Sequence, residues 1–449
     1  MEQISTFISE TAGFLWGWPL LIMLLGTHLF LTFRLRFIQR YVGKAIKLSV
    51  SSDKGSHGEI SQFSALATSL AATIGTGNII GVATAVSLGG PGAVLWVWIT
   101  GVFGIATKYS EGLLAIKYRK KNADGSFSGG PMYALEYGLK SKFLGALFAA
   151  FTAIAAFGIG ASVQANSMAS ALNESFGFNK LYVGIALFLL TGAIIIGGIK
   201  SIARVCDKLV PFMAFFYVAG CLLILALGYE TLWQSLVLIV KSAFTGHAAV
   251  GGFAGSTVMM AARYGVARGL FSNESGLGSA PIVAAAAQTR NPVRQALVSS
   301  SGTFWDTVII CALTGLVLVN TGAWTEGKEG VAITQHAFGH YFSHYGSIFL
   351  AVSLVTFTFS TIIGWAYYAE KSIEYLFGKK SVLPYKALYL VMVFLGTILS
   401  LDVVWNLGDI FNGLMAIPNL ICLVLLSGVI VSETKKYLWD GRLDAEGMD

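Results

Sequence analysis

Small and polar residues interrupt two long apolar segments of this chain, where polar groups are otherwise scarce. The first interruption is Ala72–Asn78 (ATIGTGN), and the second is Gly269–Ser279 (GLFSNESGLGS). Gly, Thr and Asn favour a local break in a helix, and the broken backbone frees carbonyl and N–H groups. Free carbonyl oxygens can bind a cation, and N–H groups at the start of a half-helix can hold a carboxylate. The two interruptions therefore predict a site for a small cation and an anionic group.

Two other interpretations apply to the first interruption taken alone. Gly75–Asn78 could be a phosphate-binding loop, but it lacks both a preceding strand and the Gly-Lys-Ser/Thr ending of that motif. A close helix crossing through small residues is the other interpretation. The second interruption favours binding, because paired broken segments in two halves of a membrane protein indicate a transport site near the bilayer midplane.

The composition indicates what must position these breaks. The 449 residues are 55% hydrophobic and only 12% charged, whereas soluble domains carry about a quarter charged residues. We expect an all-α, polytopic membrane protein with no inserted soluble domain. The four cysteines are too far apart for a metal site or a disulfide framework, and no cofactor motif is present. Eleven transmembrane helices are expected, at 13–33, 61–87, 92–117, 143–172, 181–198, 209–228, 250–288, 298–320, 346–376, 386–402 and 404–431.

The positive charges predict the topology. With the N-terminus outside, alternate loops, including 199–208 and 289–297, are cytoplasmic and hold 24 of the 30 Lys and Arg residues, and the outer loops hold three. The C-terminus is then cytoplasmic, and the net charge of +7 reflects topology rather than nucleic-acid binding. The breaks lie at matching positions in two sets of five helices, 61–228 and 250–431, and 13–33 is an additional N-terminal helix. An odd number of helices in each set inverts the second set relative to the first.

Three motifs resemble those of the alanine or glycine:cation symporter family. They are Ala71–Asn78, Gly89–Trp98 and Phe271–Pro281, and the resemblance covers essentially the whole chain. It implies the inverted five-plus-five fold of the bacterial leucine transporter, in one integral membrane domain over 1–449. It also implies a secondary active transporter of the cell membrane, not an enzyme. This transporter would carry small neutral amino acids, alanine or glycine, into the cytoplasm with Na⁺ by alternating access, and would function as a monomer.

The resemblance also assigns residues to the site. The N–H groups of Thr76 and Gly77 would hold the substrate carboxylate. A second sodium would lie between the carbonyl of Thr73 and the side chain of Asn78. The first sodium would be bound by the carbonyls of Ala71, Ile74 and Phe357 and the hydroxyls of Ser360 and Thr361. The full expected substrate site comprises Thr73, Gly75, Thr76, Gly77, Asn78, Gln164, Phe271, Ser272, Asn273, Thr361 and Trp365.

The residue types in the ninth expected helix agree with this assignment. Thr356, Thr358, Ser360 and Thr361 punctuate an apolar helix, and single hydroxyls there usually bond to carbonyls of their own helix. The adjacent pair Ser360-Thr361 is the stronger signal, because hard cations prefer oxygen ligands. Trp365, one turn beyond Thr361, either walls the pocket or packs between helices.

Charged residues inside spans are functional candidates by default. Lys108 and Glu111 are three residues apart, and we expect them to pair. Glu274 lies inside the second interruption and could gate, cap a half-helix or carry a proton. Arg263 and Arg268 precede that interruption and are expected to pair with an acid there.

Three alternatives to sodium-coupled transport can be compared with the sequence. Proton coupling through Glu274 is the runner-up within transporters. An ion channel would show repeated pore rings or filter loops, whereas this chain has two distinct breaks. An intramembrane enzyme would show a nucleophile–base pair or a metal motif, and none stands out in the sequence. His336, His340 and His344 have a spacing that could bind zinc, but an amphipathic loop helix with a polar histidine face is the favoured interpretation. Asp306 follows Trp305, and we expect it near the inner end of its span.

Overall fold

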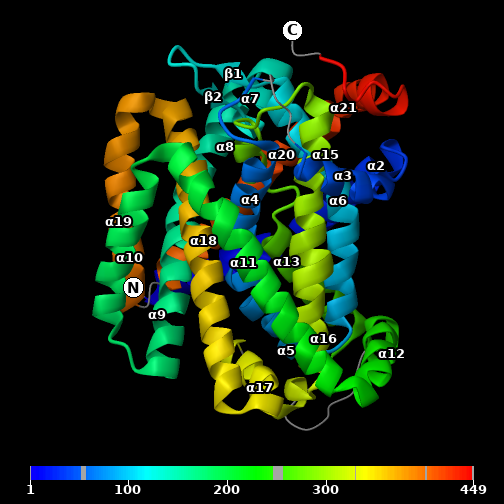
Figure 1. Cartoon of the computed structure of the whole chain (residues 1–449), viewed down its shortest axis with the longest axis vertical. Helices are drawn as coiled ribbons and strands as arrows, with labels where there is room; N and C mark the ends of the chain where they lie inside the picture. Colours follow the sequence, from blue (N-terminus) through cyan, green and yellow to red (C-terminus); the bar gives the residue numbers. More distant parts are fainter. Residues whose placement is uncertain (1, 52–56, 246–255, 329, 400–401, 447–449) are drawn as a thin grey trace.

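The computed structural model describes residues 2–51, 57–245, 256–328, 330–399 and 402–446. Helices account for almost all of its regular structure (Figure 1). Among the described residues, the strands are β1 (Lys120–Lys121) and β2 (Phe127–Ser128), which pair antiparallel in one short hairpin. The all-α architecture expected from the sequence is confirmed.

The helices follow the chain in this order. The part before residue 246 contains α1 (Glu2–Leu15), α2 (Trp18–Arg34), α3 (Val42–Ser49), α4 (Gln62–Thr73), η2 (Gly77–Gly81), α5 (Val82–Gly89), α6 (Ala93–Lys117), α7 (Pro131–Tyr133), α8 (Lys142–Ala155), η4 (Ala156–Ser162), α9 (Val163–Phe176), α10 (Lys180–Ile195), α11 (Gly198–Leu227) and α12 (Tyr229–Thr245). The part after residue 255 contains α13 (Val258–Asn273), α14 (Pro281–Ala284), α15 (Pro292–Thr303), η5 (Phe304–Cys311), α16 (Ala312–Asn320), α17 (Gly330–Phe342), α18 (His344–Phe377), α19 (Val382–Ile398), α20 (Asp402–Leu425) and α21 (Ser427–Thr434).

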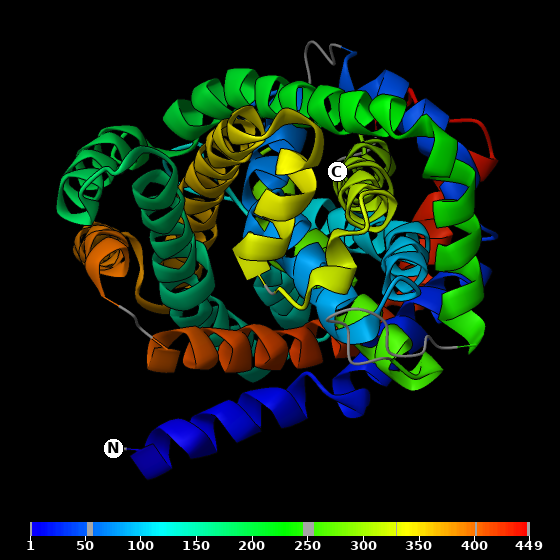
Figure 2. The same ribbon diagram turned by 90° about the horizontal axis from the view of Figure 1, so that it is seen from below.

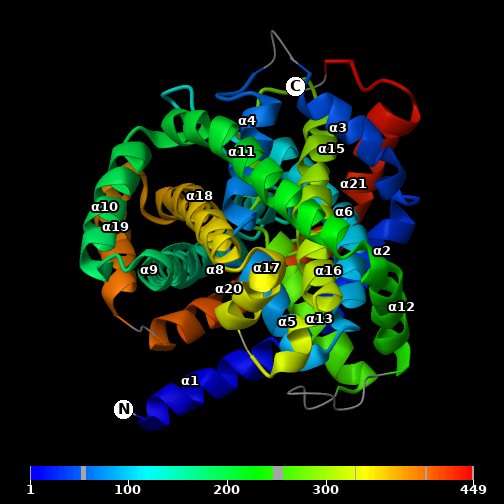
Figure 3. The ribbon, with the colours of Figure 1, turned by 60° about the horizontal axis from the view of Figure 1, so that its bottom comes forward.

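Figure 2 shows the bundle along its long axis. The α4–α5 segment lies near its middle, and α13 packs against α5 and α6. Helices α10 and α19 lie side by side at one edge, and α1 runs along the outside next to α20. The tilt of the long helices is clear in Figure 3, where α11 crosses the face of the bundle diagonally. The two interrupted segments are buried in protein, as broken backbone in a membrane requires.

The apolar helices make this a multi-pass membrane protein. Within the described residues, eight helical segments are long and apolar enough to cross a membrane, and nine if the bent α4–α5 pair counts as one span. The other two expected spans correspond to α10 and α13, which have 16 residues each. The count of eleven crossings stays a prediction, and so do the repeat boundaries at 61–228 and 250–431.

Several expected boundaries are wrong. Residues 199–208, expected as a loop, belong to α11, and α15 starts at Pro292 inside the expected 289–297 loop. Lys and Arg are good helix formers and reach water on long side chains, so a charged stretch continues a helix instead of ending it. A further helix, α12, occupies an expected outer loop. The start of the expected 250–288 span lies outside the described residues.

Glycines set the distance between some helices. A Cβ atom on Gly158 in η4 would lie 2.7 Å from the Cα atom of Gly408 in α20 and 2.8 Å from the carbonyl oxygen of Val404. Backbone atoms cannot move aside as a flexible side chain can. The two helices therefore depend on having no side chain at this crossing, as close helix contacts in membranes often do.

Replacing Gly158 by Ala should destabilise the protein by about 1–3 kcal/mol, because the added methyl group forces α20 away from η4. The measurement is the midpoint of thermal unfolding in detergent, followed by tryptophan fluorescence. Gly26→Ala is the matched control, because Gly26 is also helical and a Cβ there meets nothing within 4 Å. Equal midpoints for the two variants would contradict the close crossing.

Candidate functional site

The first interruption is a break between two half-helices. The segments Gln62–Thr73 and Gly77–Gly89 meet at an angle of 54°. The backbone N–H of Gly75 donates to Asn78 Oδ1 at 2.8 Å, and the N–H of Asn78 donates to the carbonyl of Gly75 at 3.3 Å. In a continuous helix those two N–H groups would bond to the carbonyls of Ala71 and Ile74. The Asn78 side chain thus stabilises the break and leaves two carbonyl oxygens free.

The freed carbonyls point at two hydroxyl groups of α18. Thr361 Oγ1 lies 3.2 Å from the carbonyl oxygens of both Ala71 and Ile74. Ser360 Oγ lies 3.0 Å from the Ala71 carbonyl and 3.5 Å from the Ile74 carbonyl. The carbonyl of Phe357 is also close, at 2.8 Å from Ser360 Oγ and 3.0 Å from Thr361 Oγ1. All five oxygens of the expected first sodium site therefore lie together.

This cluster has more acceptors than protons. Ser360 and Thr361 supply one hydroxyl proton each, and three carbonyls surround them. Thr356 and Thr358 differ, because their hydroxyls contact only carbonyls of their own helix. Unshared oxygen lone pairs that converge in a buried place are the arrangement that a hard cation prefers.

Gln164 of α9 contacts the first break on the other side. Its Oε1 accepts from the backbone N–H of Thr76 at 3.4 Å, and its Nε2 lies 3.2 Å from Thr76 Oγ1. The Thr76 N–H is one of the two groups that the sequence assigns to a substrate carboxylate. A Cβ on Gly75 would lie 2.5 Å from Thr361 Oγ1, so Gly75 leaves room for the groups around it. The expected residues of α9, α18 and the first break meet here.

The second break is more irregular than the first. Helix α13 ends at Asn273, and Glu274 adopts a left-handed conformation with φ +53°. Gly276 and Gly278 have φ of +90° and +88°, which side chains rarely adopt. The expected span reaches residue 288, but between the break and that residue only Pro281–Ala284 is helical. The positive-φ residues take the chain out of helical geometry and prevent its early return.

The two breaks touch at Gly77. A Cβ there would lie 3.3 Å from Ser272 Cα and 3.4 Å from the ring of Phe271. The Phe271 ring in turn meets the ring of Trp16 edge-on, with centroids 6.1 Å apart. Asn273 Oδ1 instead accepts from the N–H of Ser275 within its own break. Of the three expected residues on α13, Phe271 and Ser272 contact the first break directly.

Trp365 joins the second break to α18. Its Nε1 donates to Glu274 Oε1 at 3.0 Å, and Ser279 Oγ donates to the other carboxyl oxygen at 2.6 Å. A Cβ on Gly160 would lie 2.5 Å from the Trp365 side chain, so the indole packs tightly against η4. The expected pairing of Arg263 or Arg268 with Glu274 is wrong, because the ion pairs of the described residues include neither arginine. Glu274 bonds to Trp365 and Ser279 instead.

Asp306 is a site residue that the sequence alone did not assign to the site. Its carboxylate accepts from Asn78 Nδ2 at 2.7 Å, from Ser272 Oγ at 3.0 Å and from Thr307 Oγ1 at 2.6 Å. The side chain is 1% exposed and connects the first break to the second. We expected it near the end of a span, but it lies beside the site. An acidic residue deep in an apolar segment was the available signal.

The second sodium site at the Thr73 carbonyl and the Asn78 side chain stays a prediction. Asn78 Oδ1 already accepts from the Gly75 N–H, and its nitrogen donates to Asp306, so a cation there would use the second lone pair of this oxygen. The Thr73 hydroxyl contacts the carbonyl of its own helix at Leu70.

The expected pair of Lys108 and Glu111 in α6 is wrong. Glu111 Oε1 accepts from the Gly276 N–H at 3.0 Å and from Asn419 Nδ2 at 2.7 Å. Lys108 Nζ has no hydrogen-bond partner among the described residues. Glu111 therefore bonds to the second break and to Asn419 rather than to Lys108.

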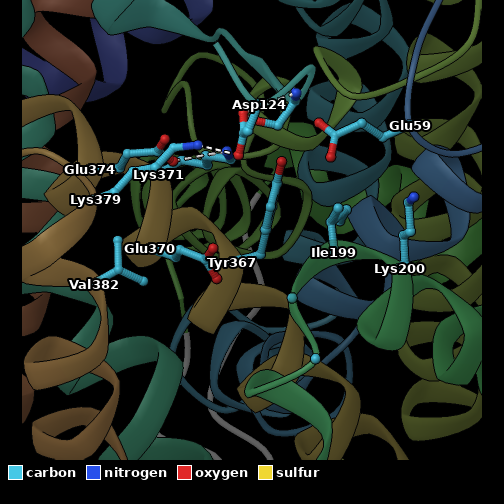
Figure 4. Close-up of a pocket in the computed structure, with 13 residues that line it drawn as sticks. Glu59, Asp124, Ile199, Lys200, Tyr367, Glu370, Lys371, Glu374, Lys379 and Val382 are labelled. Carbon is cyan, nitrogen blue, oxygen red and sulfur yellow. Dashed lines mark hydrogen bonds and ion pairs between the residues drawn. The ribbon is translucent and has the colours of Figure 1, made fainter. Parts of the chain in front are cut away.

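Two pockets are lined by residues of the helices that carry the site. One, of about 360 Å³, is lined by charged side chains at the end of α18 and by the β1–β2 hairpin (Figure 4). Tyr367 points into it, six residues beyond Thr361. At its rim Lys379 pairs with Asp124 and lowers the pKa of that carboxyl below its usual range. The other pocket, of about 260 Å³, is bounded by Trp16 and Phe271.

Known proteins share both the sequence and the fold. The model of the sodium:alanine symporter family matches residues 1–447. The sodium/alanine symporter AgcS of Methanococcus maripaludis is 48% identical, over 97% of this chain and 98% of its own. An uncharacterised transporter of Haemophilus influenzae is 50% identical, over 97% and 96%. The probable sodium/glutamine symporter GlnT of Bacillus subtilis is 38% identical, over 97% and 91%.

The fold agrees with a solved transporter. The structure of MhsT in complex with L-phenylalanine matches with a TM-score of 0.56 at 13% identity, over 84% of this chain and 98% of that one. This likeness establishes the fold of the leucine-transporter type that the motifs implied. The relatives are transporters rather than enzymes, and the chain belongs to the sodium:alanine symporter family.

Proposed function

We propose that this protein is a secondary active transporter that carries alanine or glycine into the cytoplasm together with Na⁺. The observation that carries the proposal is the cluster of five oxygens from the first break and α18. It lies next to the N–H groups of Thr76 and Gly77, which would hold the substrate carboxylate. The family and the 48% identical sodium/alanine symporter support the same ion and substrate.

The geometry explains why ion and substrate would bind together. Ile74 supplies a carbonyl to the oxygen cluster, and Thr76, two residues later, supplies an N–H to the substrate side. A bound Na⁺ therefore fixes the backbone that the substrate needs, and the substrate fixes the backbone that Na⁺ needs. One Na⁺ entering down 100 mV supplies about 2.3 kcal/mol, which corresponds to roughly fifty-fold accumulation.

The same geometry favours a small substrate. Gly75 faces Thr361 and Gln164, and Gly77 faces Phe271, so side chains from three helices surround the two glycines. A substrate bound by its carboxylate between them has room for few further atoms. Carbonyl and hydroxyl oxygens would bind its ammonium group, because the first break itself contains no acidic residue.

Without substrate, the Gln164 side chain would occupy the hydrogen-bonding position of the substrate carboxylate. Its amide oxygen accepts from the Thr76 N–H that the carboxylate would use. Binding would exchange one acceptor for another and leave no buried N–H unpaired.

The remaining assignments belong to this proposal. The protein would function as a monomer in the cell membrane, with its N-terminus outside and its C-terminus in the cytoplasm. The pocket at Tyr367 would then open to the cytoplasm and the pocket at Phe271 to the outside, one for each state of alternating access. Residues 61–228 and 250–431 would form the two inverted repeats. Na⁺ is the coupling ion, and the donor set contains only oxygens, which suits a hard cation.

Proton coupling is the second candidate. Glu274 is a buried carboxyl group inside the second break, bonded to Trp365 and Ser279, and it is a place where a proton could bind. One relative, 36% identical, is named a putative sodium/proton-dependent alanine carrier. The two candidates differ in which gradient drives uptake.

Uptake of labelled alanine by proteoliposomes should follow an imposed Na⁺ gradient, because the oxygen cluster binds the driving ion. A proton gradient imposed without Na⁺ should give no accumulation above passive leak. Accumulation driven by protons alone, with no response to Na⁺, would contradict sodium coupling and favour Glu274 as the carrier. Protein-free liposomes provide the control for leak.

Replacing Thr361 by Ala should raise the Na⁺ concentration for half-maximal uptake by about tenfold or more, because one of the five oxygens is removed from a buried site. Thr361→Ser keeps the hydroxyl and should stay within about threefold of wild type. The readout is initial alanine uptake against Na⁺ concentration at a fixed membrane potential. Wild-type sodium dependence in Thr361→Ala would show that this hydroxyl is not a ligand.

Replacing Asp306 by Asn should reduce maximal alanine uptake by about tenfold or more, because the variant loses the carboxylate that binds Asn78 and Ser272 together. Asp440→Asn removes an exposed carboxylate outside the site and should leave uptake unchanged. Reconstitution efficiency is matched by quantifying protein in the vesicles. Unchanged uptake in Asp306→Asn would mean that the link between the breaks is dispensable.

A further inference from the structure

An apolar groove opens on the outer face of the bundle, apart from the site described above. Helices α3, α4 and α11 and the segment η5 form its walls, and its volume is about 390 Å³. This size falls within the roughly 300–1,000 Å³ typical of small-molecule sites. Nearly all its lining side chains are apolar, among them Phe63, Leu66, Phe215 and Trp305. In a membrane such a groove faces acyl chains rather than water.

The inner end of the groove reaches the first break. Leu70 and Ile74 both line it, and the carbonyl of Ile74 belongs to the five-oxygen cluster. The 12-residue helix α4 forms one wall and is continuous with the break. Any occupant of the groove therefore packs against the half-helix that presents the cation ligands.

The mouth of the groove carries positive charge. Arg204 and Lys208 lie on the same face of α11 as Pro211 and Phe215, which line the groove, because positions four, seven and eleven apart share a helix face. Both basic side chains are exposed, and neither forms an ion pair with any described residue. The nearby carboxylate of Asp207 accepts from Ser64 Oγ at 2.8 Å and so turns toward α4.

Helix α3 borders the same mouth. Ile46, Ser49 and Val50 line the groove, and the exposed Lys47 lies beside them. Arg204, Lys208 and Lys47 also belong to the basic stretches that the predicted topology assigns to the cytoplasmic side. Arg204, Lys208 and Lys47 thus lie on the helices that form one end of the apolar slot, and none of them forms an ion pair with a described residue.

We propose that this groove binds an anionic phospholipid, with one acyl chain in the apolar slot and the phosphate at Lys47, Arg204 and Lys208. An uncharged apolar ligand would make no favourable electrostatic contact with the basic mouth. A soluble anion would bury no apolar surface in the slot. Basic residues at the membrane surface attract anionic head groups, and the slot fixes the attached chain. The bound lipid stabilises the position of α4 and, because α4 is continuous with the first break, also the position of that break.

Fluorescence quenching tests the proposal directly, because Trp305 lines the groove and is 37% exposed. The full-length protein is reconstituted in phosphatidylcholine nanodiscs with increasing fractions of phosphatidylglycerol or phosphatidylcholine brominated in mid-chain. The difference between wild type and Trp305→Phe isolates the Trp305 signal. Brominated phosphatidylglycerol should half-quench this signal at a several-fold lower mole fraction than brominated phosphatidylcholine.

Charge removal should abolish that preference. Arg204→Gln with Lys208→Gln should raise the half-quenching fraction of the brominated phosphatidylglycerol by roughly fivefold for each charge. The matched control is Lys120→Gln with Lys121→Gln, which removes two exposed charges on β1 and should leave the preference intact. A second variant, Ala214→Phe, fills the groove and should reduce quenching by both lipids.

Two results would overturn the proposal. Equal quenching by the two lipids would exclude recognition of the anionic head group, and absence of Trp305 quenching would exclude an acyl chain in the groove. Trp233 on α12, which is 73% exposed, reports general lipid contact through the same difference with Trp233→Phe. Because the readout is fluorescence, the result is independent of whether the protein transports alanine with Na⁺.

Discussion

The hydrogen bond from the Gly75 N–H to Asn78 Oδ1, at 2.8 Å, is the interaction on which the site depends. A backbone N–H inside a membrane protein must have a partner, and in a regular helix this one would use the carbonyl of Ala71. The asparagine side chain takes that role, so the chain can leave helical geometry without an unpaired donor. Its consequence is that carbonyl oxygens become available at the centre of the bundle. The hydroxyls of Ser360 and Thr361 lie where those oxygens point.

The second break is connected to the first by polar side chains. Asp306 binds Asn78 and Ser272, and Trp365 binds Glu274. Asn78 therefore has two functions, since its oxygen stabilises the first break and its nitrogen binds the carboxylate that also holds the second. In a water-poor interior such bonds are strong, and loss of one partner leaves the other unpaired. Movement of either break then requires a response from the other, as coupled transport needs.

The sequence predicted the general plan because it depends on local properties. Apolar segments of span length, Gly and Asn in mid-segment and the adjacent hydroxyls of α18 all carry a signal in residue type alone, and the motifs supplied the pairing of distant segments. The predictions that were wrong concern tertiary contacts. Lys108 and Glu111 are neighbours on one helix face, yet Glu111 binds the N–H of Gly276, which lies 165 residues away.

The other errors have a similar cause. Asp306 gave a signal of its type, but its bonds to Asn78 and Ser272 depend on how three segments pack. The expected helix up to residue 288 is mostly missing after Gly276 and Gly278, whose positive φ values glycine permits but does not require. The charged start of α11 continued as a helix because long basic side chains can reach water from a helix as well as from a loop.

The central claim is that ion and substrate share the backbone of the first break, and reciprocal binding at equilibrium tests it most directly. The affinity of the purified protein for alanine is measured with and without Na⁺, and its affinity for Na⁺ is measured with and without alanine. The shared backbone predicts that each ligand raises the affinity for the other by the same factor, of at least about fivefold. Alanine binding that is equally tight with and without Na⁺ would contradict the account.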